Sequence, residues 1–144
     1  MLSKWFKGAK EVAPLVIRIA LGVIFIAHGS QKLFGAFGGP GVAGFAGFMK
    51  MLNMNPPLLW AWIVTLTEFL GGLGVLFGLL TRWAGLGLAV NMAVAILLVH
   101  GKHGLFAQGG GYEYNLALIA MALALFFWGP GKISLEGAIG KELS

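Results

Sequence analysis

Hydrophobic residues gather into four long segments, at about residues 13–34, 58–80, 83–100 and 112–128. None of them carries the polar face that a helix on the surface of a soluble bundle needs. Backbone groups inside lipid must be hydrogen-bonded within their own segment, so apolar runs of this length are expected to be helices. The pattern predicts an all-α fold, an integral membrane four-helix bundle, and disfavours the alternative of buried helices in a soluble protein.

The connection between the first two segments, residues 35–57, has a pattern of its own. It begins rich in glycine, and apolar residues then recur at the i, i+3, i+4, i+7 spacing of one helix face: Phe45, Phe48, Met49 and Leu52. We therefore expect a short interfacial helix in this first outer loop, with a helix packed inside the loop as the alternative. The other connections are short, and residues 1–144 are expected to form a single membrane domain.

The basic residues Lys4, Lys7 and Lys10 raise the alternative that the first segment is a cleaved signal peptide. However, Arg18 divides the apolar stretch, and no cleavage site of the A-x-A type follows it. A retained membrane helix is the favoured interpretation. In the second segment Gly74 and Gly78 form a GxxxG pair, which we interpret as a surface for close helix packing.

Composition supports the membrane interpretation. The chain has 144 residues, of which 58% are hydrophobic and only 10% charged, whereas soluble domains carry about 25% charged residues. It contains no cysteine, which excludes thiol chemistry, disulfides and thiolate metal sites within this chain. The net charge of +5 comes from scattered basic residues without a basic patch, so no nucleic-acid partner is expected.

The basic residues also set an orientation. With a cytoplasmic N-terminus, six of them fall on the cytoplasmic side, namely Lys4, Lys7, Lys10, Arg82, Lys132 and Lys141. Three fall on the other side, namely Lys32, Lys50 and Lys102. By the positive-inside rule, this bias predicts that both termini are cytoplasmic.

A four-helix arrangement gathers the chemically versatile side chains at the outer end of the bundle. They are His28 and Lys32 on the first helix, His100 and His103 at the end of the third, and Glu113 and Asn115 at the start of the fourth. His28 and Lys32 share a helix face because they are four positions apart. For Lys32, extension to the headgroups is the alternative to a place in the bundle.

Glu68 lies in the middle of the second segment, where an ionisable group is a functional candidate by default. It is expected to point into the bundle with a polar partner within hydrogen-bonding reach, directly or through one water. The candidate partners are Arg18, His28, Lys32, His100 and Asn115, and the depths counted from the helix ends favour His28. The pair would handle protons; a structural bridge to Arg18 or His28 is the alternative. The spacing of His100 and His103 is weak evidence for a shared metal ion, and no metal site is predicted.

Several motifs together resemble the DoxX family of membrane proteins. They are Arg18-Ile-Ala-Leu-Gly22, the block from His28 to Gly35, Glu68-Phe-Leu-Gly71-Gly72, the His100/His103 segment, Gly110 to Asn115, and Gly129-Pro130-Gly131. The resemblance covers about residues 13–136. It implies a four-helix protein of a bacterial-type inner membrane, related to membrane subunits that work with quinone-linked oxidoreductases.

The functional hypothesis is a membrane subunit of an oxidoreductase or respiratory-type system, with a pocket for a quinone or another small molecule in the outer half of the bundle. Glu68 and His28 are the candidate catalytic residues. The candidate ligand-binding residues are Arg18, Lys32, His100, His103, Glu113 and Asn115. No cofactor is identified beyond quinone as a candidate. The expected partners are the lipid bilayer and either a second copy of the chain or a larger membrane complex. A non-catalytic accessory or assembly subunit and a small-molecule carrier are the alternatives.

Overall fold

The computed structural model describes residues 2–140 and Leu143, with backbone alone for residues 2–7 and Glu11. Of the basic residues used to predict orientation, Lys141 lies outside the described residues, and the side chains of Lys4 and Lys7 are not described. Within this part of the chain every regular element is a helix. The α-helices are α1 (Leu2–Phe34), α2 (Gly41–Met51), α3 (Pro57–Phe77), α4 (Thr81–Ala95), α5 (Glu113–Trp128) and α6 (Leu135–Ile139). A π-helical turn, η2 (Ile96–His100), continues α4. Single 3₁₀ turns lie before α2, as η1 (Ala36–Gly38), and between η2 and α5, as η3 (Gly101–His103) and η4 (Ala107–Gly109).

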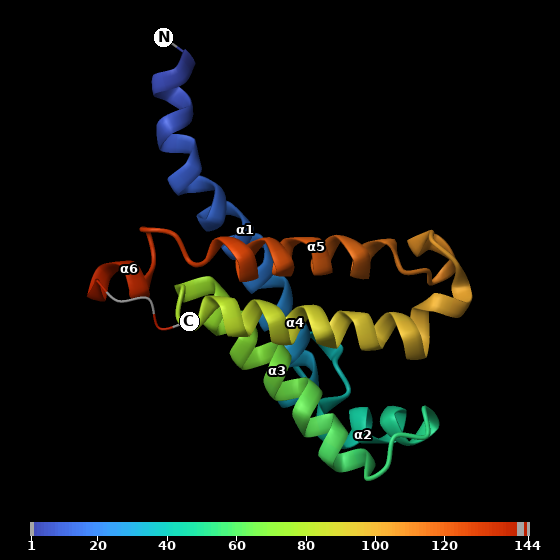
Figure 1. The fold of residues 1–144 in the computed structure, drawn as a ribbon. Coiled ribbons are helices and arrows are strands. Elements are labelled where there is room, and N and C mark those ends of the chain that lie inside the picture. The colour runs from blue at the N-terminus through green and yellow to red at the C-terminus, as the bar shows by residue number, and fades with distance from the viewer. Residues whose placement is uncertain (1, 141–142, 144) are drawn as a thin grey trace.

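The long helices form two pairs (Figure 1). Helix α1 packs along α3, and α4 packs along the antiparallel α5, while α2 lies against α3. The first turns of α1 extend away from the other helices. Three helical stretches are long and apolar enough to cross a membrane, Gly8–Phe34, Pro57–Phe77 and Thr81–His103, and α5 is a shorter apolar helix. The all-helical fold with membrane-spanning helices is therefore confirmed.

The helix ends differ from the sequence prediction in ways that local chemistry explains. Helix α3 ends at Phe77 instead of residue 80, because Gly78 adopts a left-handed conformation with φ of 71° and terminates the helix. Helix α1 already begins at Leu2 and runs without interruption through Pro14 into the apolar segment. The helix expected in the first connection is present as α2, with Phe45 and Met49 buried.

Helices α1 and α3 approach each other closely at glycines. A Cβ atom on Gly29 would lie 2.6 Å from the backbone nitrogen of Phe69, and one on Gly72 would lie 2.8 Å from the nitrogen of Ile26. The expected packing pair Gly74 and Gly78 has a different role. Gly78 ends α3, and a Cβ there would meet the Arg18 guanidinium at 2.7 Å. The close helix contact therefore uses other glycines than the GxxxG pattern suggested.

The end of the molecule where α3 and α5 terminate is held by Arg18, which is only 2% exposed. Its guanidinium donates to the carbonyl oxygens of Val75 (2.8 Å) and Leu76 (2.8 Å) at the end of α3. It also donates to the carbonyls of Pro130 (2.9 Å) and Ile133 (2.6 Å), in the segment after α5. Arg18 thereby joins the first helix to both the middle and the end of the chain.

Two further contacts close the same end. Arg82, at the start of α4, donates to the carbonyls of Phe126 (2.7 Å) and Phe127 (2.8 Å) in the last turn of α5. The backbone nitrogen of Thr81 donates to buried Glu136 of α6 at 3.3 Å. Charged side chains thus satisfy helix termini here, as cations commonly do at the carbonyl end of a helix.

Candidate functional site

A pocket of about 560 Å³ lies at the opposite end from Arg18, between the α1–α3 pair and the α4–α5 pair. Helix α2 contributes one wall, and residues of η2 and η4 also line the pocket. Most of its lining is apolar, including Phe25, Met49, Val64 and Leu118. Its volume and its few polar groups are typical of small-molecule sites, which span roughly 300–1,000 Å³.

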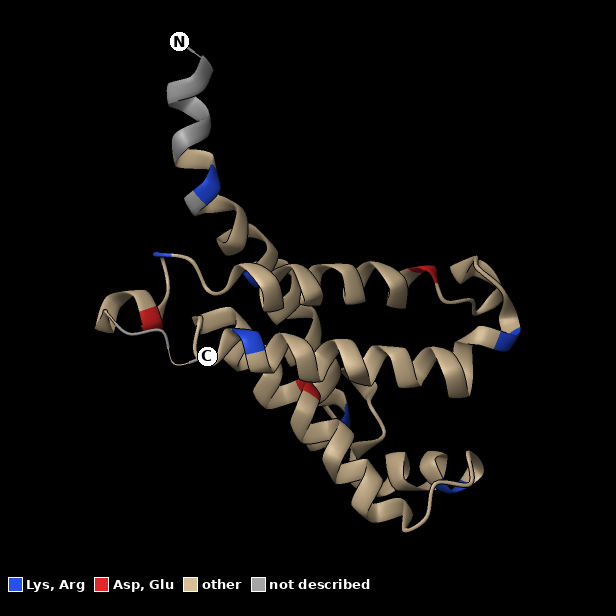
Figure 2. Ribbon diagram, in the orientation of Figure 1, with Lys and Arg blue, Asp and Glu red and all other residues tan. Residues whose placement is uncertain are grey.

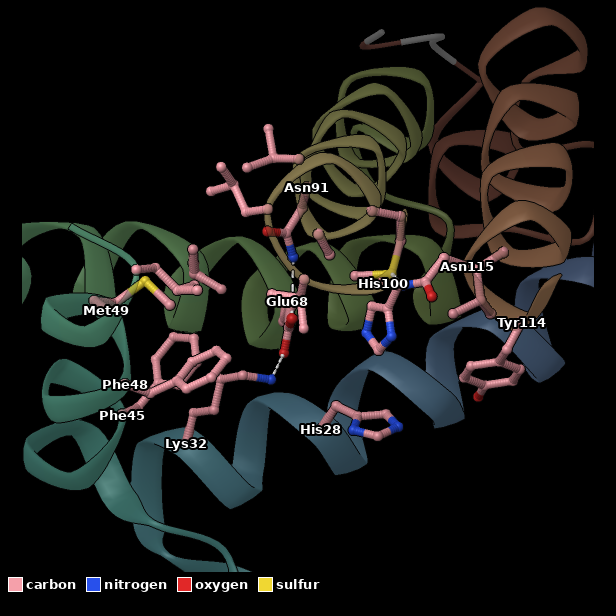
Figure 3. A pocket seen from close by; sticks show the side chains of 18 of the residues that line it. His28, Lys32, Phe45, Phe48, Met49, Glu68, Asn91, His100, Tyr114 and Asn115 are labelled. Carbon is pink, nitrogen blue, oxygen red and sulfur yellow. Dashed lines mark hydrogen bonds and ion pairs between the residues drawn. The ribbon is translucent and has the colours of Figure 1, made fainter. Parts of the chain in front are cut away.

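Glu68 lies in the wall of this pocket with both carboxylate oxygens engaged (Figure 3). Lys32 Nζ lies 2.5 Å from Oε2, and Asn91 Nδ2 donates to Oε1 at 3.0 Å. Glu68 is 4% exposed. A buried carboxylate needs such partners, because an unpaired charge in an apolar medium is too costly to keep. The carboxylate therefore connects three helices, α1, α3 and α4, at one point.

The sequence positions these three groups through helix geometry. Glu68 is eleven residues after Pro57, so it lies about 16 Å along α3 from its outer end. Lys32 is in the last turn of α1, and its long apolar stem lets the ammonium reach inward. The ring of Phe45 on α2 lies 5.2 Å from Lys32 Nζ. The lysine is thus held between α3 and α2 instead of extending to the headgroups.

The remaining polar groups lie at the far end of the pocket from α2, where Figure 3 shows His28, His100 and Tyr114. His100 Nδ1 is 2.8 Å from the carbonyl oxygen of Gly110 in the connecting loop. Asn115 is buried, and its Nδ2 donates to the sulfur of Met92 at 3.4 Å. No hydrogen bond to His28 is formed by the described residues, and its ring is exposed. These groups leave donors and acceptors available inside the cavity.

The structure brings together part of the predicted site. His28, Lys32, Glu68, His100 and Asn115 all line the pocket. Arg18 lies at the opposite end of the molecule, and His103 and Glu113 are exposed and outside the lining. The Oε1 atom of Glu113 instead accepts from the backbone nitrogen of Ala107 at 2.6 Å, which holds the loop over the pocket.

The prediction that Glu68 points inward with a polar partner is confirmed, but the partner is Lys32 and not His28. The prediction compared how far each residue lies from the end of its own helix. That comparison ignores how α1 crosses α3 and how far a lysine side chain extends, so it did not favour Lys32. Sequence reasoning also missed Asn91 and Tyr114. Asn91 had a detectable signal, since it is the single amide side chain in the third apolar segment.

Among the described residues, no group of three or more histidine, aspartate or glutamate side chains is placed to hold a metal ion. His100 and His103 diverge, since only His100 lines the pocket. The polar side chains that line the cavity, among them Lys32, Glu68, Asn91 and His100, can form hydrogen bonds, and the ionisable ones can exchange protons.

Long apolar helices with a charged pair enclosed between them define a small, all-helical membrane protein. The profile of the DoxX family matches residues 13–101. The chain therefore belongs to the DoxX family of membrane proteins. No solved structure matches it.

Two relatives show how far the similarity extends. The chain is 31% identical over 140 residues to "Inner membrane protein YqjF" of Escherichia coli K12, covering 94% of this chain and 98% of that one. It is 32% identical over 115 residues to "Putative oxidoreductase CatD" of Bacillus subtilis 168, covering 80% of this chain and 79% of that one. These similarities support a membrane location for the chain along nearly its whole length.

Proposed function

We propose that the chain is a membrane subunit of an oxidoreductase system and that its outer pocket binds the headgroup of a quinone. The observation that carries the proposal is a mostly apolar cavity with the Glu68–Lys32–Asn91 cluster in its wall. A quinone needs this combination, because its ring is apolar and its two oxygens accept hydrogen bonds. The similarity to a protein named as an oxidoreductase supports the same class.

The pocket supplies donors and proton-exchanging groups for both ends of such a ring. Lys32 lies on one side of Glu68, and His28 and Tyr114 lie toward the other end of the cavity. Reduction of a quinone consumes two electrons and two protons. The chain has no cysteine to relay electrons, so a redox-active partner subunit supplies them. Glu68 and His28 pass the protons, since both line the cavity and His28 is also exposed.

In the membrane, we propose that α5 completes a four-helix bundle and that α2 lies in the outer interface. Helix α5 has 16 residues, about 24 Å, which is less than the roughly 30 Å hydrocarbon thickness. Its Glu113 end and the polar loop before it then lie close to the headgroups. Both termini are cytoplasmic in this arrangement, and the pocket belongs to the outer half of the bilayer, in a bacterial-type inner membrane.

The inner end argues against the carrier alternative. A carrier must expose its site alternately to both sides, whereas the described inner end is filled by Arg18 and its four carbonyl partners. The accessory-subunit alternative has one observation in its favour, namely that Glu68 connects three helices and so has a structural role as well. Quinone content separates that alternative from the proposed function.

The test measures quinone that co-purifies with the protein in mild detergent, by lipid extraction and chromatography. We expect quinone with the wild-type protein and a loss of about tenfold, near 1.4 kcal/mol, in Glu68→Gln and Lys32→Met. Lys102→Met is the matched control, because Lys102 is exposed, lies at the same end and does not line the pocket. Only the folded fraction from size-exclusion chromatography is assayed. Quinone absent from wild type, or retained equally by all variants, contradicts the proposal and favours the accessory subunit.

A further inference from the structure

The two ends of the pocket differ in chemistry. Figure 3 shows Phe45, Phe48 and Met49 of α2 at one end, and His28, His100 and Tyr114 at the other. The charged pair Lys32–Glu68 lies between them. A molecule that fits both ends is therefore itself amphiphilic, with a polar part toward the histidines and an apolar part toward α2.

The wall contributed by α4 also changes from polar to apolar along its length. Asn91, Val94, Ala95 and Leu98 all line the pocket, and their i, i+3, i+4, i+7 spacing places them along one helix face. The stripe begins at the amide that bonds Glu68 and is apolar from there to η2. A path of apolar side chains thus leads from the polar cluster toward the outer part of α4.

This apolar path is open at its side. Phe48, Val94 and Leu98 line the pocket and yet are 37%, 37% and 41% exposed. Met92, on the neighbouring face of α4, is buried and bonded by Asn115 of α5, so the exposed edge of α4 is the one away from α5. We call the gap between α2 and α4, bordered by Phe48, Val94 and Leu98, the apolar side opening.

The depth of the opening places it in hydrocarbon. Val94 lies six residues before His100, so it is about 9 Å along the helix from the end of η2. The loop residues Ala107, Gly110 and Gly111 line the pocket nearer to the outer surface, and the Ala107–Glu113 contact holds that loop in place. In a bilayer, the apolar side opening therefore faces lipid tails, while the loop separates the cavity from the aqueous phase.

We infer that the ligand of the pocket is a tailed, membrane-dissolved amphiphile that enters from the bilayer through the apolar side opening and leaves its hydrocarbon tail lying between Phe48 on α2 and Val94 and Leu98 on α4. The inference rests on the proposed function for the nature of the headgroup. It adds the class of ligand, the route of access and the residues that contact the tail. The polar head reaches Lys32 and Glu68, and the tail stays in the lipid-facing gap.

The first experiment compares two probes with one headgroup, 2,3-dimethoxy-5-methyl-benzoquinone without a tail and its decyl derivative. Val94→Trp fills the opening, so we expect it to weaken binding of the decyl probe by about tenfold and to change binding of the tailless probe by less than about twofold. Val90→Trp is the control, because Val90 is exposed one turn away on α4 and does not line the pocket. Val90→Trp should leave the affinity for both probes unchanged. Each variant is compared with the wild type under the same conditions, so the partition of the probes into detergent cancels.

His28→Trp fills the opposite, polar end, and it should weaken both probes equally. An unchanged ratio of decyl to tailless affinity in Val94→Trp overturns the inference. A selective loss of the decyl probe in His28→Trp also overturns it, because the tail then leaves between α1 and α5.

A second measurement does not depend on the headgroup. The chain has no cysteine, so Leu98→Cys and Val90→Cys each give one labelling site for an environment-sensitive fluorophore. Doxyl-labelled stearic acid should quench the label at position 98 saturably and at lower concentration than at position 90. Equal, non-saturating quenching at both positions overturns the route of entry. If the fatty acid quenches at position 98 but neither quinone binds wild-type protein, the route stands and the quinone assignment fails.

Discussion

The Glu68 carboxylate has two partners among the described residues, an ammonium and an amide from two other helices. Removing one member of a buried ion pair leaves the other charge without compensation, which commonly costs about 3–5 kcal/mol. Replacing both members by neutral groups removes that penalty. The pair therefore offers a double-mutant cycle that measures its coupling directly.

We expect Lys32→Met alone to lower the melting temperature in detergent clearly, since Glu68 then keeps only Asn91 and must take up a proton or water. The double variant Lys32→Met/Glu68→Gln should regain most of the loss. Thermal unfolding in one detergent of the wild type, Lys32→Met, Glu68→Gln and the double variant gives the coupling free energy between the two side chains. Additive effects of the two single changes would mean that the two side chains do not interact in the folded protein.

The burial of Glu68 against a polar partner could be predicted from the sequence, because an acid in the middle of an apolar segment has few explanations. Its partner could not, because the distance between two side chains depends on how their helices cross. The roles of Arg18 show the same limit. Its burial was expected, but the sequence does not indicate that its partners are backbone carbonyls of residues 57 to 115 positions away.

At the scale of the elements, the contact between α1 and α3 depends on the missing side chain at Gly29. A methyl group there would lie 2.6 Å from the Phe69 nitrogen and 2.7 Å from its Cα, and backbone cannot yield as a flexible side chain does. The two helices would have to separate locally. Because Lys32 is less than one turn away from Gly29, that separation would also move the ion pair.

We expect Gly29→Ala to destabilise the protein by about 1–3 kcal/mol, as overpacking of a close contact does, and to lower ligand binding. Gly47→Ala on α2 is the control. A Cβ at Gly47 has no atom within 4 Å, so alanine in that helix should be neutral or stabilise by about 0.5–1 kcal/mol. Thermal unfolding in detergent checks both. Equal stability of the two variants would contradict the close approach of α1 and α3.

Element types were well predicted, and the partners of elements were not. The apolar segments and the stripe from Phe45 to Leu52 indicated helices because helical periodicity is a local property. Close approach is not local. Gly74 and Gly78 have the spacing of a packing motif, yet Gly22, Gly29 and Gly72 make the tight contacts between α1 and α3. Which glycines face a neighbouring helix depends on the rotation of each helix about its axis.

At the scale of the whole molecule, charge is distributed unevenly along the bundle (Figure 2). Arg18, Arg82 and Glu136 contact the end of α3, the end of α5 and the start of α4, whereas Lys50 is in the last turn of α2 and Lys102 is in η3, at the pocket end. Lys32 is turned inward to Glu68, so it contributes little to the outer surface. Among the described residues, Lys50 and Lys102 then remain as basic side chains at the pocket end that are not turned inward. The prediction that both termini are cytoplasmic places this end on the outer side.

Topology reporters test the orientation. A reporter enzyme that is active only outside the cytoplasm should be inactive when fused after residue 144 and active when inserted in the exposed loop between residues 104 and 108. A fluorescent reporter that matures only in the cytoplasm should give the opposite pattern. Activity of the extracytoplasmic reporter at the C-terminus would invert the orientation and place the pocket in the inner half of the bilayer.

Arg18 has a consequence for how the protein is made. The chain places Pro130, one of its acceptors, 112 positions after the arginine, so synthesis delivers the donor long before this partner. Until the last segment emerges, the guanidinium of the inserted first helix has only the two acceptors on α3, and its remaining donors must stay hydrated. Complete burial of the first helix is therefore a late event in biogenesis. A nascent chain that stops after α5 therefore lacks two of the four carbonyl acceptors that the Arg18 guanidinium has in the finished protein.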